Sequence, residues 1–315
     1  MIAKALPILS CALLGCTAAA QSLAPLEVLK RYYTNRGKVP CVLVQNYTGE
    51  KSVTRMKYVS DGEGNMVWRV IQPLADEGKS TYVTPEWLIA IDPARKQIFK
   101  MESPVQGRFS ATRVSKLMAA NYKLSHEPMA TIAGRPAYHV KAVPKAPGLP
   151  TKQFYVDKEL FMLLKVDNEV AGRPFGTSME VISCRPDEDI EIDLPDENDP
   201  DWKVIEQWGP VFIKAIDADI ASELDFQPVA PKTLGMGFEL EAMFLAGKEH
   251  APYLQLRYTD GLTLVSVMVA QNSRDSKQFP FRTAVTSGSI KAAIEGDIPS
   301  GIANKLIRTY LAAKR

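Results

Sequence analysis

Hydrophobic and polar residues alternate most regularly in residues 131–167. Within this stretch, residues 137–143 place every second side chain on one face, as in a β-strand with one buried side. The segment 144–150 contains three prolines and one glycine, and it breaks the pattern as a hairpin loop does. We therefore expect three antiparallel strands here, with a second turn at 157–159.

Shorter strand-like segments lie on both sides of this stretch, and turn-forming residues separate them. They are expected at 41–47, 52–59, 65–71, 82–84, 87–91, 97–101 and 178–184. Amphipathic helices are expected at 25–35 and 112–120. The pattern predicts an α+β fold for residues 22–186, in which a strongly curved antiparallel half-barrel sheet wraps round helices.

The composition changes after this first domain. Residues 187–201 contain nine acidic residues and no basic one. A run of like charge is usually a solvated linker, and docking to a basic partner is the functional alternative. We expect an acidic linker and a connecting helix over 187–221, with the helix at 202–221.

A second, smaller α+β domain is expected over residues 222–315. Its strands are predicted at 238–244, 253–258, 262–270, 281–287 and 291–295. The triplet at 259–261, Thr-Asp-Gly, is a strong hairpin signal. A final helix is expected at 300–312, because two adjacent apolar rows run along it.

The N-terminal residues have the pattern of an export signal. Lys4 supplies a positive charge, an apolar run follows, and three alanines precede Gln21. Residues 1–20 are therefore predicted to be a signal peptide, which makes the mature protein exported and soluble. The segment 13–16 also resembles a lipobox, so lipid attachment at Cys16 is the alternative to plain cleavage.

The net charge argues against a nucleic-acid partner, and the cysteine count leaves one possible disulfide open. The chain has 315 residues and a formal net charge of +2, which gives no electrostatic reason to expect a nucleic-acid partner. After cleavage, Cys41 and Cys184 are the two remaining cysteines. Export permits a disulfide between them, and two separate buried thiols are the other interpretation.

Catalytic and metal-binding motifs are missing from the sequence. The three histidines do not have the spacing of metal ligands, and no Gly-x-Ser-x-Gly elbow occurs. The paired acids lie in the predicted linker, whereas acid–base catalysis needs fixed geometry. We therefore expect no metal, no cofactor and no enzymatic activity.

Short motifs in both halves carry a family resemblance. In the first half they occur at 122, 132–140, 154–157 and 163–167, and in the second half at 234–238, 256–262 and 296–299. The first set resembles the half-open barrel of LolA, LolB and the N-terminal domain of MucB/RseB, and the second resembles the C-terminal domain of MucB/RseB. The long acidic linker and Gly235-Met236-Gly237, where the family pattern has a proline, depart from it.

The resemblance implies a bacterial source, a periplasmic location and a regulatory role. MucB/RseB proteins are periplasmic regulators of an envelope-stress sigma factor. They bind a membrane-anchored anti-sigma factor and shield it from proteolysis, and lipid or lipopolysaccharide releases them. LolA-type proteins use the same concave sheet to carry acyl chains.

A curved sheet covered by few helices can leave an apolar cavity, which agrees with an acyl-chain or lipid ligand. The residues proposed to line it are Val42, Val44, Met56, Trp68, Trp87 and Val140. Simple core packing is the alternative role for each of them. The alternatives for the whole protein are a periplasmic lipid or lipoprotein carrier without a sigma-factor partner, and an exported hydrolase.

Overall fold

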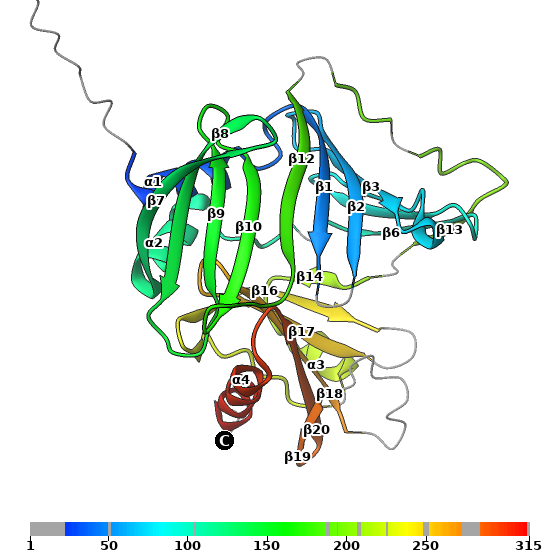
Figure 1. Cartoon of the computed structure of the whole chain (residues 1–315). Helices are drawn as coiled ribbons and strands as arrows, with labels where there is room; N and C mark the ends of the chain where they lie inside the picture. The colour runs from blue at the N-terminus through cyan, green and yellow to red at the C-terminus, as the bar shows by residue number, and fades with distance from the viewer. Residues whose placement is uncertain are drawn as a thin grey trace, which may run out of the picture.

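The described part of the chain forms two β-sheets, a large curved sheet and a smaller one below it in the view of Figure 1. The structure is a computed structural model that describes residues 23–49, 52–103, 105–186, 190–193, 195–206, 209–224, 226–247, 252–272 and 284–313. In these ranges no helix is long and apolar enough to cross a lipid bilayer.

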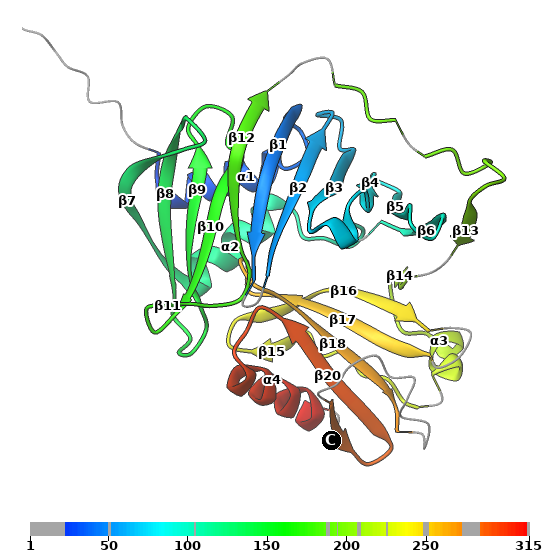
Figure 2. The ribbon, with the colours of Figure 1, turned by 45° about the vertical axis from the view of Figure 1, so that its right-hand side comes forward.

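The larger sheet has 13 strands in the order β13-β6-β5-β4-β3-β2-β1-β12-β10-β9-β8-β7, with β11 paired to β10. Only the β13–β6 pair is parallel. The strands before β13 are β1 (Cys41–Thr48), β2 (Val53–Ser60), β3 (Met66–Gln72), β4 (Ser80–Val83), β5 (Trp87–Asp92), β6 (Gln97–Glu102), β7 (Tyr122–Ile132), β8 (Arg135–Pro144), β9 (Thr151–Asp157), β10 (Leu163–Val170), β11 (Arg173–Pro174) and β12 (Ser178–Pro186). Figure 2 shows the sheet bending round two helices, so the predicted curved antiparallel sheet is confirmed.

Helices α1 (Pro25–Asn35) and α2 (Ala111–Asn121) lie on the concave side of this sheet. Proline is tolerated at the start of α1, since its missing N–H would have no helical partner there. Ser110 caps α2, because its hydroxyl accepts a hydrogen bond from the Arg113 N–H. The apolar faces of both helices pack on β7, β8 and β9 through Val28, Leu29, Val114, Met118, Tyr122, Val140, Ala142, Phe154 and Val156.

The stretch 131–167 forms β8, β9 and β10, so the three predicted strands are present. Val140 of β8 lies opposite Phe154 of β9, and both face the helices. The helices therefore cover the part of the sheet that contains β7 to β9. A short 3₁₀-helix, η1 (Leu74–Asp76), follows β3.

The acidic segment after β12 differs from its prediction. In place of a connecting helix over 202–221, the described residues form β13 (Lys203–Glu206), β14 (Val211–Ile213) and the short helix α3 (Ala218–Glu223). The physical reason is that β13 pairs with β6 and buries apolar surface against Ile98. Two ion pairs, from Lys100 to Glu197 (2.8 Å) and from Lys96 to Asp201 (3.3 Å), hold the acidic residues along the same edge.

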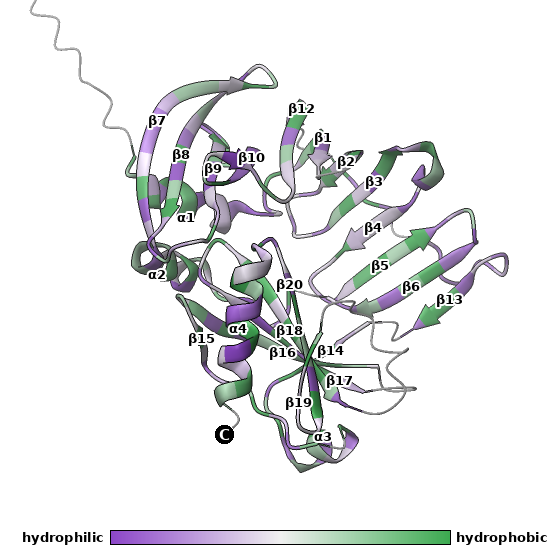
Figure 3. Ribbon diagram, turned by 60° about the horizontal axis from the view of Figure 1, so that its bottom comes forward, coloured by the Kyte–Doolittle hydropathy of each residue, from purple (hydrophilic) through white to green (hydrophobic). Residues whose placement is uncertain are grey.

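The smaller sheet has seven strands in the order β14-β16-β17-β18-β20-β19, with β15 paired to β16. Its remaining strands are β15 (Thr233–Gly235), β16 (Phe238–Ala246), β17 (Tyr253–Thr259), β18 (Leu264–Gln271), β19 (Ala284–Ser287) and β20 (Ile290–Gly296). Helix α4 (Ser300–Ala313) covers one face of the sheet and buries Leu306, Ile307 and Tyr310. Figure 3 shows hydrophobic and hydrophilic residues alternating around α4, as expected for a helix with one buried side.

The turn between β17 and β18 joins the two domains. Asp260 is fully buried, and its Oδ2 atom accepts a hydrogen bond of 2.7 Å from the Tyr122 hydroxyl. The Asn121 amide donates to the Asp260 carbonyl at 2.9 Å. At Gly261 an added Cβ would lie 2.8 Å from the Met118 backbone nitrogen, so only glycine allows this close approach. The turn is therefore fixed against the end of α2 and the start of β7.

Replacing Tyr122 with phenylalanine should loosen this turn. The change removes a hydrogen bond to a buried carboxylate, which contributes about 1.5–3 kcal/mol. The Leu262 and Thr263 amides, which donate to Asp260 Oδ1, should then exchange with deuterium at least about ten times faster. Amide exchange measured by NMR or mass spectrometry checks this.

Tyr258→Phe is the matched control. The Tyr258 hydroxyl is also buried, but it donates to the Pro231 carbonyl inside the second domain. Equal acceleration at Leu262 and Thr263 in both variants would contradict a specific role for the Tyr122–Asp260 contact.

Candidate ligand-binding site

A cavity of about 230 Å³ lies between the end of α1 and the uncovered strands of the large sheet, and we call it the barrel cavity. Its walls come from α1 and the turn after it, from β1, β2, β3, β10 and β12, and from the β9–β10 turn. The lining residues are Tyr32, Asn35, Arg36, Gly37, Val39, Cys41, Leu43, Gln45, Tyr47, Tyr58, Met66, Trp68, Phe161, Met162, Leu163, Val166 and Met179.

The lining is apolar and aromatic with a single ionised group. Leu43, Met66 and Met179 contribute aliphatic surface, and the Tyr58 and Trp68 rings contact each other at 5.0 Å between centroids. Burial raises the pKa of the Tyr58 hydroxyl, so this group stays neutral. Arg36 is the one charged side chain among the lining residues. Such a site suits an apolar chain with a polar end.

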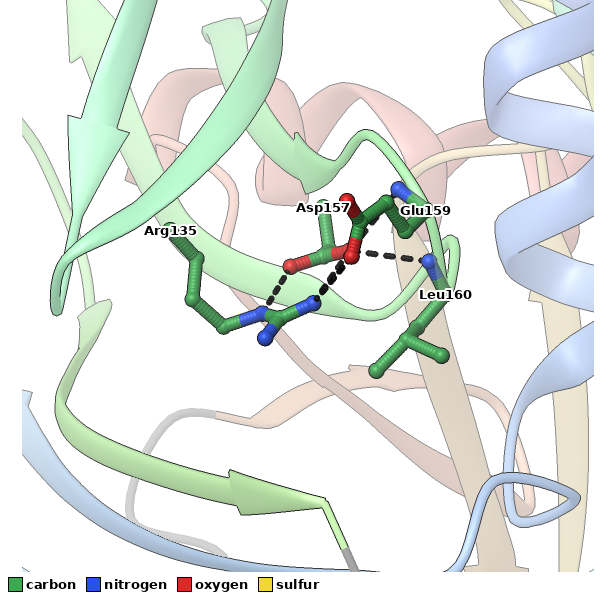
Figure 4. Close-up of polar contacts among 4 residues, drawn as sticks. All are labelled: Arg135, Asp157, Glu159 and Leu160. Atoms are coloured by element: carbon green, nitrogen blue, oxygen red, sulfur yellow. Dashed lines mark hydrogen bonds and ion pairs between the residues drawn. The ribbon is translucent and has the colours of Figure 1, made fainter.

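One wall of the barrel cavity depends on a buried ion pair, shown in Figure 4. Arg135 of β8 binds the Asp157 carboxylate at the end of β9, and its Nη2 atom also lies 3.2 Å from Glu159. Asp157 Oδ1 accepts hydrogen bonds from the backbone N–H groups of Glu159 and Leu160, at 2.9 and 2.8 Å. These bonds fix the β9–β10 turn and therefore the position of Phe161, which lines the barrel cavity.

The ionic state of Asp157 follows from its partners. Burial alone would raise the pKa of this carboxyl, but the hydrogen bonds from Arg135 and from the Leu160 and Glu159 amides outweigh it. The net result is a pKa below the ordinary value of 3.8. Asp157 is therefore ionised at neutral pH.

A second cavity of about 500 Å³ lies where the two domains meet, and we call it the junction cavity. Its lining residues are Tyr33, Arg36, Gly64, Met66, Thr84, Pro85, Val105, Arg108, Phe109, Ala111, Val114, Glu241, Arg257, Thr259, Gly261, Leu262, Thr263 and Leu264. Arg36 and Met66 line both cavities. The two spaces therefore adjoin at these side chains.

Two of the six residues proposed from the sequence lie on the part of the sheet that faces the barrel cavity. Trp68 of β3 lines the barrel cavity. Met56 of β2 lies directly opposite Gln45 of β1, so the two side chains share a face. Met56 is not among the lining residues of either cavity.

Two others lie elsewhere in the domain. Val140 is fully buried in the core beneath α1 and α2, which agrees with the packing alternative. Trp87 of β5 lines neither cavity; it is 39% exposed, and the Lys100 ammonium lies 4.7 Å from its ring centroid.

On β1, the residues that line the cavity alternate with the residues that were predicted from the sequence to line it. Cys41, Leu43 and Gln45 line the barrel cavity, whereas Val42 and Val44 point to the opposite face. Both sets contain apolar residues, so alternation predicted a strand but did not decide which face turns inward.

Cys41 and Cys184 lie in one apolar cluster and are free thiols in the structure. Leu43 is paired directly with Cys184, which places both cysteines on the same face of adjoining strands. Burial raises the pKa of Cys41 to about 12, and burial likewise raises the pKa of Cys184, so both groups are protonated at neutral pH. A disulfide between them stays a prediction, and Cys16 lies outside the described residues.

No group of three His, Cys, Asp or Glu side chains that could hold a metal ion occurs among the residues that the structure describes. His139 stacks on Tyr155 at 4.2 Å between ring centroids and contacts Gln153 at 2.9 Å. These are ordinary contacts within the sheet.

Asp157→Asn should destabilise the first domain by about 3 kcal/mol at neutral pH, because it leaves Arg135 without its buried partner. Since the folded-state pKa of Asp157 is depressed, its contribution is present above the ordinary value of 3.8 and is lost as the pH falls through the folded-state pKa. The deficit of the variant should therefore shrink at acid pH.

Urea unfolding at several pH values measures this difference. Glu159→Gln is the control, because the Glu159 side chain is 71% exposed and its pair with Arg135 is worth less than about 1 kcal/mol. Equal stability of the two variants at neutral pH would show that the buried pair does not hold this turn.

Comparison with known proteins gives no sequence match but clear structural ones. Neither protein-family models nor the sequences of curated proteins match this chain. A crystal structure of MucB has a TM-score of 0.56 at 16% identity, covering 90% of this chain and 95% of that one. The complex structure of Pseudomonas aeruginosa MucA/MucB gives 0.57 at 14% identity, with 90% and 96% covered.

A crystal structure of MucB in complex with MucA(peri) gives a TM-score of 0.56 at 13% identity, with the same two coverages of 90% and 96%. At these identities the comparison establishes the fold alone. The resemblance seen in the sequence motifs is confirmed at that level: nine-tenths of this chain has the fold of MucB.

Proposed function

We propose that this protein is an exported, non-enzymatic regulator that binds a membrane-anchored anti-sigma factor and senses an acyl-bearing ligand. The observation that carries the proposal is the barrel cavity, an apolar and aromatic space with one cation at its edge, within the fold of MucB. The cavity is the basis for proposing ligand sensing, and the fold shared with MucB is the basis for proposing an anti-sigma factor as the partner.

Burial of an acyl chain provides enough free energy for measurable binding. Each methylene removed from water contributes about 0.8 kcal/mol, so six buried methylenes contribute about 5 kcal/mol before the cost of association. The lining of Leu43, Met66, Trp68 and Met179 offers dispersion contacts to such a chain. Neutral tyrosine hydroxyls beside it can hydrogen-bond an ester or a headgroup.

The choice of partner rests on similarity. Two of the similar structures are of MucB bound to MucA or its segment MucA(peri). The second domain also supports a regulator, since a simple carrier with a half-barrel needs only the first domain. The predicted signal peptide, with Cys16 as the alternative lipid attachment point, would place the protein in the periplasm, where such a partner is exposed.

Trp68→Glu should abolish most acyl binding. The change puts a charge into the apolar lining of the barrel cavity, and we expect the affinity for dodecyl glucoside to fall at least tenfold. Titration calorimetry below the critical micelle concentration measures it. The purified mature protein should also carry a lipid-sized mass in native mass spectrometry.

Trp87→Glu provides the matched control, because Trp87 lines neither cavity. Its affinity for dodecyl glucoside should equal that of the unaltered protein. Loss of binding in both variants, or no binding by the unaltered protein, would contradict an acyl site in the barrel cavity.

Crosslinking in intact cells tests the partner. The proposal expects a membrane-anchored protein with a cytoplasmic domain that binds a sigma factor. Recovery of lipoproteins alone would instead favour the carrier.

A further inference from the structure

The junction cavity has an excess of positive charge. Its charged lining residues are Arg36, Arg108, Arg257 and Glu241, three cations and one anion. Glu241 is already engaged, because its carboxylate lies 2.8 Å from Arg257 Nε and accepts the Phe109 N–H at 3.0 Å. The charge of Glu241 is therefore used within the protein, and two cations are left.

Arg36 and Arg108 have no ion-pair partner in the part of the chain that the structure describes. Both side chains are open to the solvent of the hollow, although protein surrounds them. Burial and the positive charges of Arg36 and Arg257 together lower the pKa of Arg108 to about 10, although the negative charge of Glu241 opposes them. Three positive charges thus lie along one cavity with a single carboxylate, Glu241, which is bound to Arg257, and an anion would stabilise this arrangement.

Neighbouring acids do not neutralise these arginines. Asp260 is fully buried behind the cavity wall, where it accepts hydrogen bonds from Tyr122 and from the Leu262 and Thr263 amides. Glu239 is paired with Arg113 of α2.

The position of Arg36 connects this charge to the barrel cavity. Arg36 follows the last residue of α1 and lines both spaces together with Met66. On its other side, Tyr32 and Tyr58 line the barrel cavity. A molecule with its chain in the barrel cavity would therefore bring its head to Arg36, and from there toward Arg108.

We infer that Arg36 and Arg108 form a binding site for the anionic headgroup, a phosphate or carboxylate, of an amphiphile whose acyl chain occupies the barrel cavity. The inference rests on the proposed acyl site and adds the chemistry of the headgroup. A guanidinium suits this role, since its planar N–H groups match the oxygens of phosphate and carboxylate. The second domain takes part, because Arg257 and the 259–263 turn complete the wall.

The test compares two probes that share a chain and differ in headgroup. Dodecyl phosphate and dodecyl glucoside are titrated into the full exported chain and into Arg36→Gln, Arg108→Gln and the double variant. We expect about a tenfold loss of dodecyl phosphate affinity in each single variant and about a hundredfold loss in the double variant. Dodecyl glucoside affinity should change less than about twofold, since no charge is involved.

Lys38→Gln is the matched control, since it removes the same charge two residues from Arg36 and lines neither cavity. It should leave the affinity for both probes unchanged. The preference of the unaltered protein for dodecyl phosphate should also weaken as salt is raised. Unchanged circular dichroism and melting temperature establish that the variants fold.

The outcomes separate the inference from the proposed function. Binding of dodecyl glucoside, with no preference for dodecyl phosphate that depends on Arg36 and Arg108, would overturn the headgroup site and leave the acyl site standing. Failure of both probes to bind the unaltered protein would overturn both. Arginine-dependent binding of inorganic phosphate as tight as that of dodecyl phosphate would contradict a ligand that spans the two cavities.

Discussion

The arrangement of the molecule depends on one buried carboxylate. Asp260 turns the chain between β17 and β18 by accepting the Leu262 and Thr263 amides, and with its other oxygen it accepts the Tyr122 hydroxyl from the first domain. Burial raises the pKa of Asp260, and these hydrogen bonds, together with the positive charge of Lys152, oppose that effect. The Asp260 carboxylate, which is costly to bury, thus lies where the two domains contact each other in one fixed geometry. This contact also forms the junction cavity.

The barrel cavity has a different origin: helices α1 and α2 cover only part of the concave face of the large sheet. Helices α1 and α2 seal β7, β8 and β9 with a continuous apolar core, but α1 ends at Asn35 before it reaches β1, β2 and β3. The chain then returns to the sheet through Gly37, whose positive φ disfavours other residues and where an added Cβ would lie 3.1 Å from Met66 Sδ. Tyrosines, methionines and one arginine line the remaining concavity. The same chain reversal that leaves this space open places Arg36 at its edge.

Local signals predicted much of this fold. Alternation and turn residues gave the strands of 131–167 and the hairpin at 259–261, because those patterns are set within a few residues. They did not predict that β13 pairs with β6, since that pairing brings together residues about a hundred positions apart. For the site, Trp68 was predicted correctly as a lining residue, whereas Val42 and Val44 were chosen over Leu43 because strand alternation does not identify the inward face. Arg36 and Arg108 carry no local signal, as only the meeting of two domains brings them together.

Hydrogen–deuterium exchange of the mature protein, with and without dodecyl phosphate, tests the central claim most directly. If the acyl chain enters the barrel cavity, amides in residues 32–45 and 58–68 should exchange more slowly when the probe is present, because these segments form its walls. Amides of β20 and α4 should not respond, because no residue of these elements lines either cavity. Protection confined to the second domain, or no protection despite measured binding, would contradict the account.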